Sequence, residues 1–152
     1  METLSSNFAP LNPGLYSAKE RWNSSQVGFQ IDSHTHESFP NVDYAEVAIF
    51  NVSEFEGSEN SPSTGDCKIR DAFYRLYFDD LPKVADLGTL QILDSRKETF
   101  TLIEEVCTDL IDKGIIPLVI GGGHDISYAI YKAYDNLQRG MTLCAADSTF
   151  NI

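Results

Sequence analysis

Residues 115–128, with the sequence IIPLVIGGGHDISY, constrain the fold of this chain more than any other stretch. The first six are aliphatic or β-branched apart from one proline, and they predict a buried parallel strand. The glycines at 121–123 permit a tight turn whose backbone can approach a ligand closely. His124 and Asp125 follow at once. Because sites in open α/β sheets lie at the carboxyl ends of strands, this segment indicates a candidate metal site.

The same residues have a simpler interpretation. The glycines can form an ordinary strand-to-helix turn, and Asp125 can cap the helix that follows. One short motif does not decide between these two interpretations.

A second apolar run, residues 141–146, predicts the next strand, and Asp147 comes directly after it. Consecutive parallel strands are often neighbours in the sheet. We therefore expect Asp147 to lie beside His124 at adjacent strand ends. Cys144 falls inside this strand, where we expect it to be buried as a small apolar side chain.

The order of predicted elements from residue 43 onward is that of an α/β sandwich with a mainly parallel sheet. The pattern divides the chain into an irregular amino-terminal region, residues 1–42, in which prolines and glycine interrupt any long period, and an α/β domain, residues 43–152. The predicted elements are a strand at 45–52, a loop at 53–65, a helix at 66–77, a short strand at 84–88, a helix ending near Gly114, and the strand, helix and strand described above.

Two helices show clear apolar stripes. The helix before Gly114 is expected to begin at a cap formed by Asp94 or Ser95. Its stripe, and that of the helix after the glycines, consist of Phe100, Ile103, Val106, Cys107, Leu110 and Ile111, and of Ile126, Ala129, Ile130, Ala133, Tyr134 and Leu137. We expect the tyrosines of the second helix to serve packing rather than acid catalysis.

The helix at 66–77 is expected to bury Ile69, Phe73 and Leu76. For Arg70 we expect a surface ion pair rather than a role in fixing the neighbouring loop. We expect Asp86 to cap or bridge locally.

Charge and length exclude several classes of protein. The 152 residues include 23 acidic and 11 basic side chains, and the formal charge of −12 opposes binding to nucleic acid or to an anionic membrane. The amino terminus lacks a basic stretch followed by an apolar one, and no apolar run reaches the length of a membrane span. We expect a soluble, cytoplasmic protein. The three cysteines are widely separated, so neither a disulfide framework nor a thiolate zinc site is indicated.

A third candidate for metal binding is His34-Thr-His36-Glu37, because alternating residues of an extended segment share a face. Nothing else nearby supplies ligand geometry. We expect a solvated polar loop instead.

The glycine-rich segment Gly-Gly-Gly-His-Asp resembles the first metal-ligand motif of the ureohydrolases, which comprise arginases, agmatinases and formimidoylglutamases. The segment around Ile69 and Arg70 and the Asp-Leu-Gly at residues 86–88 are similar to ureohydrolase segments and occur in the same order. The third glycine looks most like the formimidoylglutamase branch. The resemblance implies the amino-terminal portion of an arginase-like three-layer α/β fold. It also implies that His124 binds one of two manganese ions, the only cofactor indicated.

The second ureohydrolase motif, Asp-x-His-x-Asp, is altered in this chain. Asp147 matches its first aspartate, but Thr149 stands in place of the histidine and Asn151 in place of the second aspartate. Threonine cannot replace a neutral imidazole, and asparagine supplies a carbonyl oxygen without negative charge. The metal ligands that remain are His124, Asp147 and, weakly, Asn151. Any divalent ion bound there is expected to be single and weakly held.

Two functions remain open. In the family, two manganese ions lower the pKa of a bridging water for hydrolysis of an amidine C–N bond, with formimidoylglutamate as the substrate in the formimidoylglutamase branch. The family also takes carboxylate ligands from a later strand, which this sequence does not contain. We therefore favour a non-catalytic ureohydrolase-like domain that retains the fold for binding or assembly. The alternative is the amino-terminal part of a manganese-dependent hydrolase whose remaining ligands lie outside this chain.

The exposed edge of the predicted last strand also bears on partners. An apolar edge strand without a neighbour favours association. We expect a homo-oligomer that covers the strand at 141–146 or its helix, unless a missing carboxy-terminal segment or residues 1–42 cover that edge.

Overall fold

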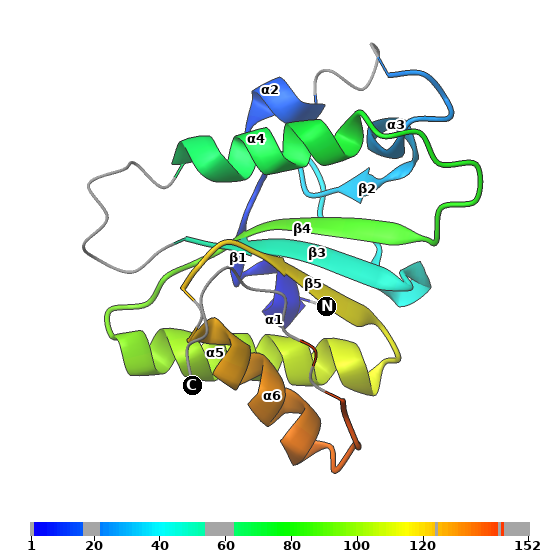
Figure 1. Cartoon of the computed structure of the whole chain (residues 1–152). Coiled ribbons are helices and arrows are strands. Elements are labelled where there is room, and N and C mark those ends of the chain that lie inside the picture. Colours follow the sequence, from blue (N-terminus) through cyan, green and yellow to red (C-terminus); the bar gives the residue numbers. More distant parts are fainter. Residues whose placement is uncertain (1, 17–21, 54–62, 124, 143, 145–152) are drawn as a thin grey trace.

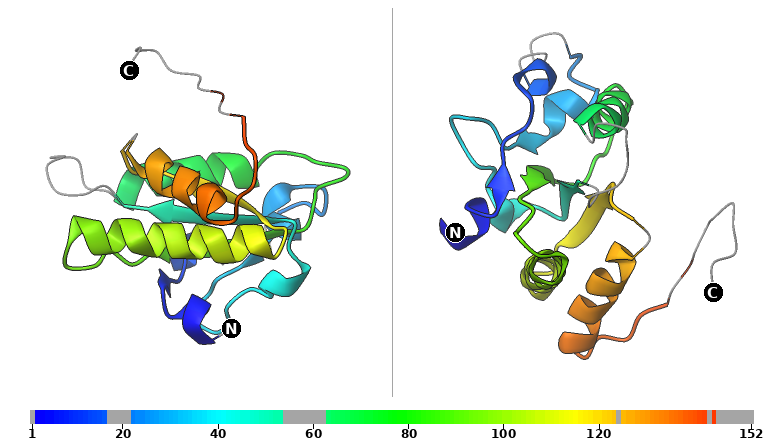
Figure 2. Two further views of the ribbon diagram at one scale, coloured as in Figure 1. Left: turned by 90° about the horizontal axis from the view of Figure 1, so that it is seen from below. Right: turned by 90° about the vertical axis from the view of Figure 1, so that its left-hand side faces the viewer.

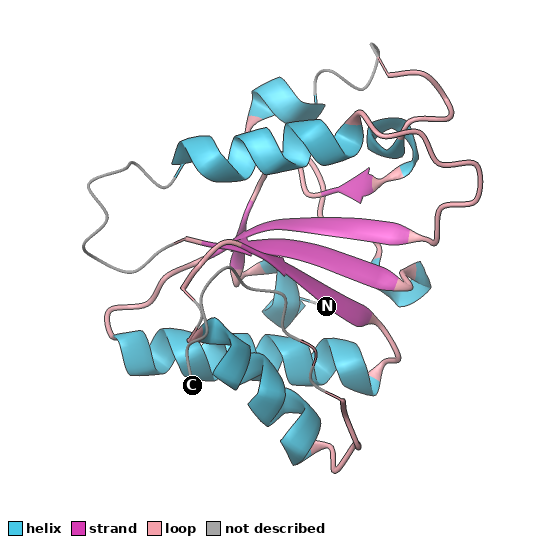
Figure 3. Cartoon of the chain, viewed as in Figure 1, coloured by secondary structure: helices cyan, strands magenta, loops and turns pink. Residues whose placement is uncertain are grey.

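The computed structural model describes residues 2–16, 22–53, 63–123, 125–142 and 144. The strands lie between two layers of helices (Figures 1 and 3). The strands are β1 (Phe8–Ala9), β2 (Asp32–Ser33), β3 (Val47–Val52), β4 (Val84–Leu90) and β5 (Ile116–Ile120). The helices are α1 (Glu2–Ser5), α2 (Pro13–Tyr16), α3 (Val27–Gln30), the 3-10 helix η2 (Val42–Tyr44), α4 (Ser63–Tyr74), α5 (Arg96–Asp112) and α6 (Ile126–Asn136).

The sheet has the order β1-β4-β3-β5, and β2 pairs with β4 as well. The β2·β4, β3·β4 and β3·β5 pairs are parallel, and only the β1·β4 pair is antiparallel. Helix α4 covers one face of the sheet, and α5 and α6 cover the other (Figures 1 and 2). This arrangement confirms the predicted three-layer α/β fold with a mainly parallel sheet.

The central strands are buried on both faces, as parallel strands generally are. Residues 48–52 of β3 are all buried, and so are residues 84–88 of β4. Helix α5 begins at Ser95, whose hydroxyl accepts a hydrogen bond from the backbone N–H of Glu98 at 3.2 Å. The predicted stripe of α5 lies in the core, with Ile103, Cys107 and Leu110 fully buried. The periodic pattern therefore predicted this helix correctly.

Strand β4 carries a bulge at its centre. Ile49 of β3 pairs with Asp86, but Asn51 pairs with Thr89, so β4 has one residue more than β3 over this stretch. Gly88 adopts φ +90° there, and a Cβ on it would lie 2.2 Å from the carbonyl oxygen of Ala9. Glycine is required at this position by both the backbone conformation and the close approach of β1.

The amino-terminal region is tied to the sheet through two short strands. β2 pairs with the first half of β4 and β1 with its second half, so together they occupy the β4 edge that faces away from β3. The described residues of this region also form the one-turn helices α1, α2 and α3, where the sequence indicated irregular structure. Pairing with β4 supplies the order that local periodicity does not.

The described residues of the segment 141–146, in which a strand was predicted, do not form one. Met141, Thr142 and Cys144 lie outside any helix or strand, and the rest of that segment lies outside the described residues. A strand needs a neighbouring backbone about 4.8 Å away, but the described chain after α6 leads away from the sheet (Figure 2). Cys144 is exposed, so its predicted burial is also wrong. Among the described helices, none is long and apolar enough to cross a membrane.

Candidate functional site

The glycine-rich turn joins the carboxyl end of β5 to α6, as the sequence indicated. Gly121 and Gly122 have φ values of +81° and +76°, which L side chains rarely adopt. A Cβ on Gly121 would lie 2.8 Å from Oδ1 of Asn51 and 2.9 Å from the carbonyl oxygen of Val52. The turn therefore packs directly on the end of β3. This contact, and not only a ligand, explains why glycine is needed.

Asp125 follows this turn and occupies the N-cap position of α6. Its side chain makes no capping hydrogen bond. Instead, its carboxylate forms an ion pair with the guanidinium of Arg96, at the start of α5. Asp125 thus occupies the predicted N-cap position but does not make the capping hydrogen bond that was predicted for it. The carboxylate that the motif delivers is already engaged by a cation.

An open groove lies between the first turns of α5 and α6, next to the glycine-rich turn. It is lined by Arg96, Lys97, Phe100, Asp125 and Tyr128. The guanidinium of Arg96 lies over the Phe100 ring, 5.6 Å from its centroid. The sequence pattern did not single out Arg96, because nothing in its own helix distinguishes it from any charged first-turn residue.

The predicted metal ligands cannot be placed in this site. His124, Asp147, Thr149 and Asn151 all lie outside the described residues. Convergence of His124 and Asp147 at adjacent strand ends therefore remains a prediction. Among the residues that the structure does describe, no group of three or more His, Cys, Asp or Glu side chains could hold a metal ion.

A buried ion pair lies beneath α4, where the sequence had suggested a surface ion pair for Arg70 and a local cap or bridge for Asp86. Arg70 and Asp86 are both fully buried. Nε of Arg70 donates to Oδ2 of Asp86 at 2.8 Å, and Nη2 donates to Oδ1 at 3.1 Å. Nη2 also donates to the carbonyl oxygen of Gly88 at 2.9 Å. The expectation of a surface ion pair for Arg70 was wrong, because the buried carboxylate of Asp86 requires a cation with bidentate geometry.

Tyr74 and Gly88 complete this network. The Tyr74 hydroxyl donates to Oδ2 of Asp86 at 2.8 Å, and the backbone N–H of Gly88 donates to Oδ1 at 3.0 Å. Burial, with the adjacent Asp86 carboxylate, raises the pKa of Tyr74 far above its usual range. The hydroxyl therefore stays protonated and remains a donor. The network joins α4 to the β4 bulge and leaves no free acid or base for catalysis.

The inward face of α4 also differs from the predicted one. Arg70 and Tyr74, four residues apart, point into the core, and Phe73 is partly buried against it. Ile69 is instead 53% exposed, and Leu76, which lies beyond the end of α4, is 50% exposed. A residue-type rule assigns arginine to the surface, so the pattern selected the wrong phase of the helix.

His34 has a structural role as well. Its Nδ1 lies 2.9 Å from the carbonyl oxygen of Leu87, so Nδ1 carries the proton and donates it. His34 is buried and its ring packs edge-on against Phe39, at 4.9 Å between centroids. The expected solvated loop is therefore wrong for His34 and correct for His36 and Glu37, which are exposed.

The fold and the glycine-rich turn at the end of β5 agree with a comparison of the sequence with known protein families. Residues 45–148, more than half of the chain, match the model of the arginase family. The chain belongs to the arginase family. The resemblance that its glycine-rich motif suggested is thereby confirmed, and its fold is that of an amino-terminal portion of an arginase-like domain.

Two curated relatives match different shares of the chain. The mitochondrial guanidino acid hydrolase of Rattus norvegicus is 32% identical over 120 residues, which are 78% of this chain and 31% of that protein. An uncharacterized 32.2 kDa protein of Methanothermus fervidus is 40% identical over 57 residues, which are 37% of this chain and 20% of that protein. The chain thus spans less than a third of the length of either relative.

Two solved structures share the fold. A Trypanosoma cruzi formiminoglutamase variant with Mn²⁺ has a TM-score of 0.53 at 22% identity, covering 62% of this chain and 36% of that one. The agmatine ureohydrolase of Thermoplasma volcanium also has a TM-score of 0.53, at 16% identity, covering 77% of this chain and 41% of that one. At these identities the likeness concerns the fold alone.

The donor set of this chain does not fit a pair of manganese ions. Of the side chains at the positions that resemble the two metal motifs, only His124 and Asp147 are strong donors. The carboxylate of Asp125, the residue after His124, is held by Arg96.

Proposed function

We propose that this chain on its own is not catalytic and that it retains the arginase-family fold for binding or assembly. The observation that carries the proposal is the pair Thr149 and Asn151, at positions where the family motif supplies a histidine and an aspartate. A pair of divalent ions that activates water needs several anionic and imidazole ligands around both ions. A hydroxyl and a carboxamide supply neither the charge nor the basicity.

The described part of the site supports the same proposal. The Arg96–Asp125 ion pair lies next to the turn that carries His124, and it engages the carboxylate that could attract a divalent cation. The turn itself is held by contacts with β3.

The test is hydrolysis by the purified chain. Formimidoylglutamate, arginine and agmatine are each incubated with the chain and an excess of Mn²⁺, alongside Mn²⁺ alone. We expect no turnover above the metal-only control. Turnover that exceeds this control and disappears in His124→Ala would overturn the proposal.

A second measurement separates a weak metal site from none. The chain, its His124→Ala variant and the double variant Thr149→His/Asn151→Asp are titrated with Mn²⁺ and followed by electron paramagnetic resonance of the free ion. We expect the double variant to bind more tightly than the chain, because it restores an imidazole and a carboxylate. Equal affinity of the chain and the double variant would mean that positions 149 and 151 do not face the metal.

A second candidate function rests on the relative with the broader coverage. The chain is 32% identical to a guanidino acid hydrolase over 120 residues, so it is also a candidate for the amino-terminal part of an amidine hydrolase. In that case, a longer product of the same gene carries carboxylate pairs on a later strand. Mapping the transcript and assaying its full product with guanidino acids and Mn²⁺ distinguishes the two proposals. A non-catalytic domain gives no hydrolysis, whether it is assayed as this chain or as the full product.

A further inference from the structure

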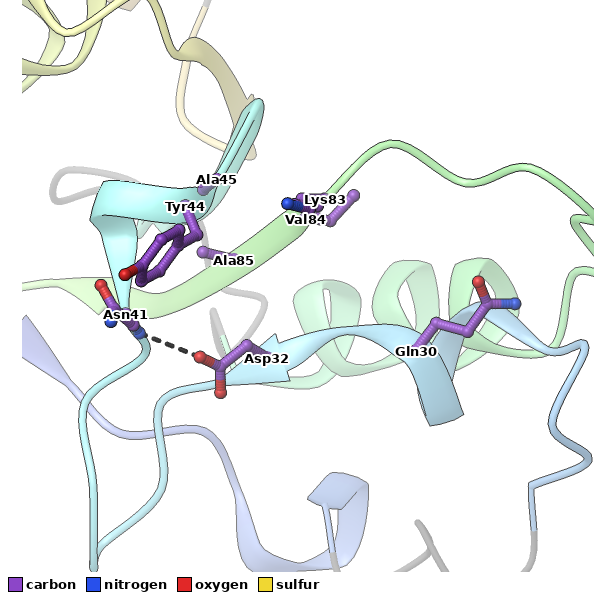
Figure 4. Close-up of a pocket in the computed structure, with 8 residues that line it drawn as sticks. All are labelled: Gln30, Asp32, Asn41, Tyr44, Ala45, Lys83, Val84 and Ala85. Atoms are coloured by element: carbon purple, nitrogen blue, oxygen red, sulfur yellow. Dashed lines mark hydrogen bonds between the residues drawn. The ribbon is translucent and has the colours of Figure 1, made fainter.

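A second hollow of the molecule lies at the opposite end of the sheet from the glycine-rich turn. Val84 and Ala85, the first residues of β4, form part of its wall, and Ala45 precedes β3 at the same end. The cavity volume is about 230 Å³. Its polar lining consists of Gln30, Asp32, Asn41, Tyr44 and Lys83 (Figure 4). Because family sites lie at the carboxyl ends of strands, this cavity is separate from the site described above.

The backbone holds the two charged residues of the cavity in place. Asp32 lies directly beside Ala85 in the parallel β2·β4 pair. Oδ2 of Asp32 accepts a hydrogen bond from the backbone N–H of Asn41 at 2.9 Å, which closes the loop between β2 and η2 (Figure 4). On the other side, the backbone N–H of Lys83 donates to Oε2 of Glu46 at 3.0 Å. The carbonyl oxygen of Lys83 accepts from the backbone N–H of Glu46 at 2.7 Å.

Three polar groups of the lining keep unused hydrogen-bonding capacity. Within the part of the chain that the structure describes, the Lys83 ammonium, the Tyr44 hydroxyl and Oδ1 of Asp32 have no protein partner. Gln30 donates its amide to the carbonyl oxygen of Phe78 at 3.1 Å, which leaves its own carbonyl oxygen as an acceptor. In Figure 4 the Tyr44 ring lies beside Asn41 on the side of the Asp32 carboxylate, and Lys83 lies next to Val84 at the start of β4.

The charges of this lining select among kinds of ligand. The cavity contains one cation, Lys83, and one anion, Asp32, so its local charge is balanced although the chain carries −12. A ligand with only an anionic group meets the repulsive field of the whole chain and of Asp32. A ligand with only a cationic group meets Lys83. A molecule that carries both groups satisfies both residues.

Size limits the ligand further. A volume of about 230 Å³ lies below the roughly 300–1,000 Å³ of sites for drug-sized molecules. It corresponds to about eight water molecules at roughly 30 Å³ each. We propose that this cavity binds a small dipolar molecule of the amino-acid class, with its carboxylate at Lys83 and its cationic nitrogen at Asp32.

The proposal is tested with probes of one length that differ in charge. 4-Aminobutanoate, butanoate and butylamine are titrated into the ¹⁵N-labelled chain at low salt, with amide shifts recorded by NMR. Glycine and 6-aminohexanoate bracket the separation of the two charges. We expect saturable shifts at the amides of Asp32, Asn41 and Lys83, and an affinity for the best dipolar probe at least about fivefold above that for either singly charged probe.

Matched variants assign the two charges. Lys83→Met and Asp32→Asn are each expected to weaken binding of the best dipolar probe at least about fivefold. The amide of Asp32→Asn keeps an oxygen that can accept from Asn41, so the loop is retained. The controls Lys68→Met and Asp80→Asn remove the same charges from exposed positions outside the cavity and are expected to leave the affinity unchanged.

Three results would overturn the proposal. The first is an absence of saturable shifts with every probe. The second is binding of butanoate or butylamine as tight as that of the dipolar probes. The third is an equal effect of the cavity variants and their controls, which would indicate a response to net charge alone. Amide spectra of all four variants, recorded without ligand, verify that each remains folded.

Discussion

The buried pair Arg70–Asp86 is expected to be among the most sensitive points of the fold. Replacing Arg70 by methionine removes its two hydrogen bonds to Asp86 and its hydrogen bond to Gly88. Among the described residues, the Tyr74 hydroxyl and the Gly88 N–H then remain as donors to the Asp86 carboxylate. Replacing Asp86 by asparagine keeps one oxygen, but its new amide donors face the donors of Arg70 and Tyr74. Either change leaves a buried charge without its partner.

The magnitude follows from this burial. Breaking a fully buried ion pair costs roughly 3–5 kcal/mol, because the remaining charge keeps its desolvation penalty. That is a large part of the roughly 5–15 kcal/mol by which folded domains are stable. The exposed pair Arg75–Asp71 on the same helix is the matched control, with side chains that are 63% and 44% exposed. Asp71→Asn is expected to change the free energy of unfolding little, because exposed ion pairs contribute little to stability.

The assay is urea unfolding followed by circular dichroism, with the free energy of unfolding extrapolated to water. Arg70→Met, Asp86→Asn, their double variant and Asp71→Asn are compared with the unaltered chain. We expect the double variant to lose less than the sum of the two single losses, since each loss already includes the broken pair. The reasoning is refuted if Asp86→Asn costs no more than Asp71→Asn, or if the two buried changes are additive.

Three further predictions concern the bulge, the cysteines and the sheet edge. Gly88→Ala should lower the free energy of unfolding by at least about 2 kcal/mol in the same assay. Gly114→Ala is the control and should lower it by less, since a Cβ at Gly114 meets nothing within 4 Å although its φ is +80°. Burial raises the pKa of Cys107 from its ordinary value of 9.0 to about 12. Peptide mapping after brief alkylation at pH 8 should therefore find Cys144 modified and Cys107 intact. Equal labelling of the two cysteines would contradict the burial of Cys107. Ile116, 61% exposed on β5, is expected to lie at a contact between copies of the chain, and Ile116→Lys should shift any oligomer seen by sedimentation velocity toward monomer.

The sequence predicted the long elements because their burial is periodic. Helix α5 has apolar residues at helical spacing, and β3 is a nearly continuous apolar run, so local pattern and tertiary burial agree. Helix α4 fails this rule because its inward positions include Arg70. Only the partner, Asp86 on β4, explains that burial, and the two residues are 16 positions apart. A carboxylate inside an apolar strand is the one sequence signal that pointed to a buried cation nearby.

The candidate sites were predictable to different extents. The glycine turn followed from its residue types, since the positive φ values of Gly121 and Gly122 are rarely adopted by other residues. The ion pair between Arg96 and Asp125 joins two helices that begin at the same end of the sheet, after the carboxyl ends of β4 and β5. It could not be read from spacing. The cavity at Asp32 and Lys83 depends on the pairing of β2 with β4. A strand of two residues is too short to be predicted from a periodic pattern.

The two edges of the sheet differ, and the difference bears on assembly. On the β4 side, β2 and β1 occupy the edge, and the Arg70–Asp86 pair fixes the bulge at which one strand gives way to the other. On the β5 side, the described residues supply no neighbour, and Ile116 and Leu118 are 61% and 44% exposed. Unpaired apolar edges favour pairing with another chain. The described strands of the amino-terminal region, β1 and β2, lie at the opposite edge, so association is expected to involve β5.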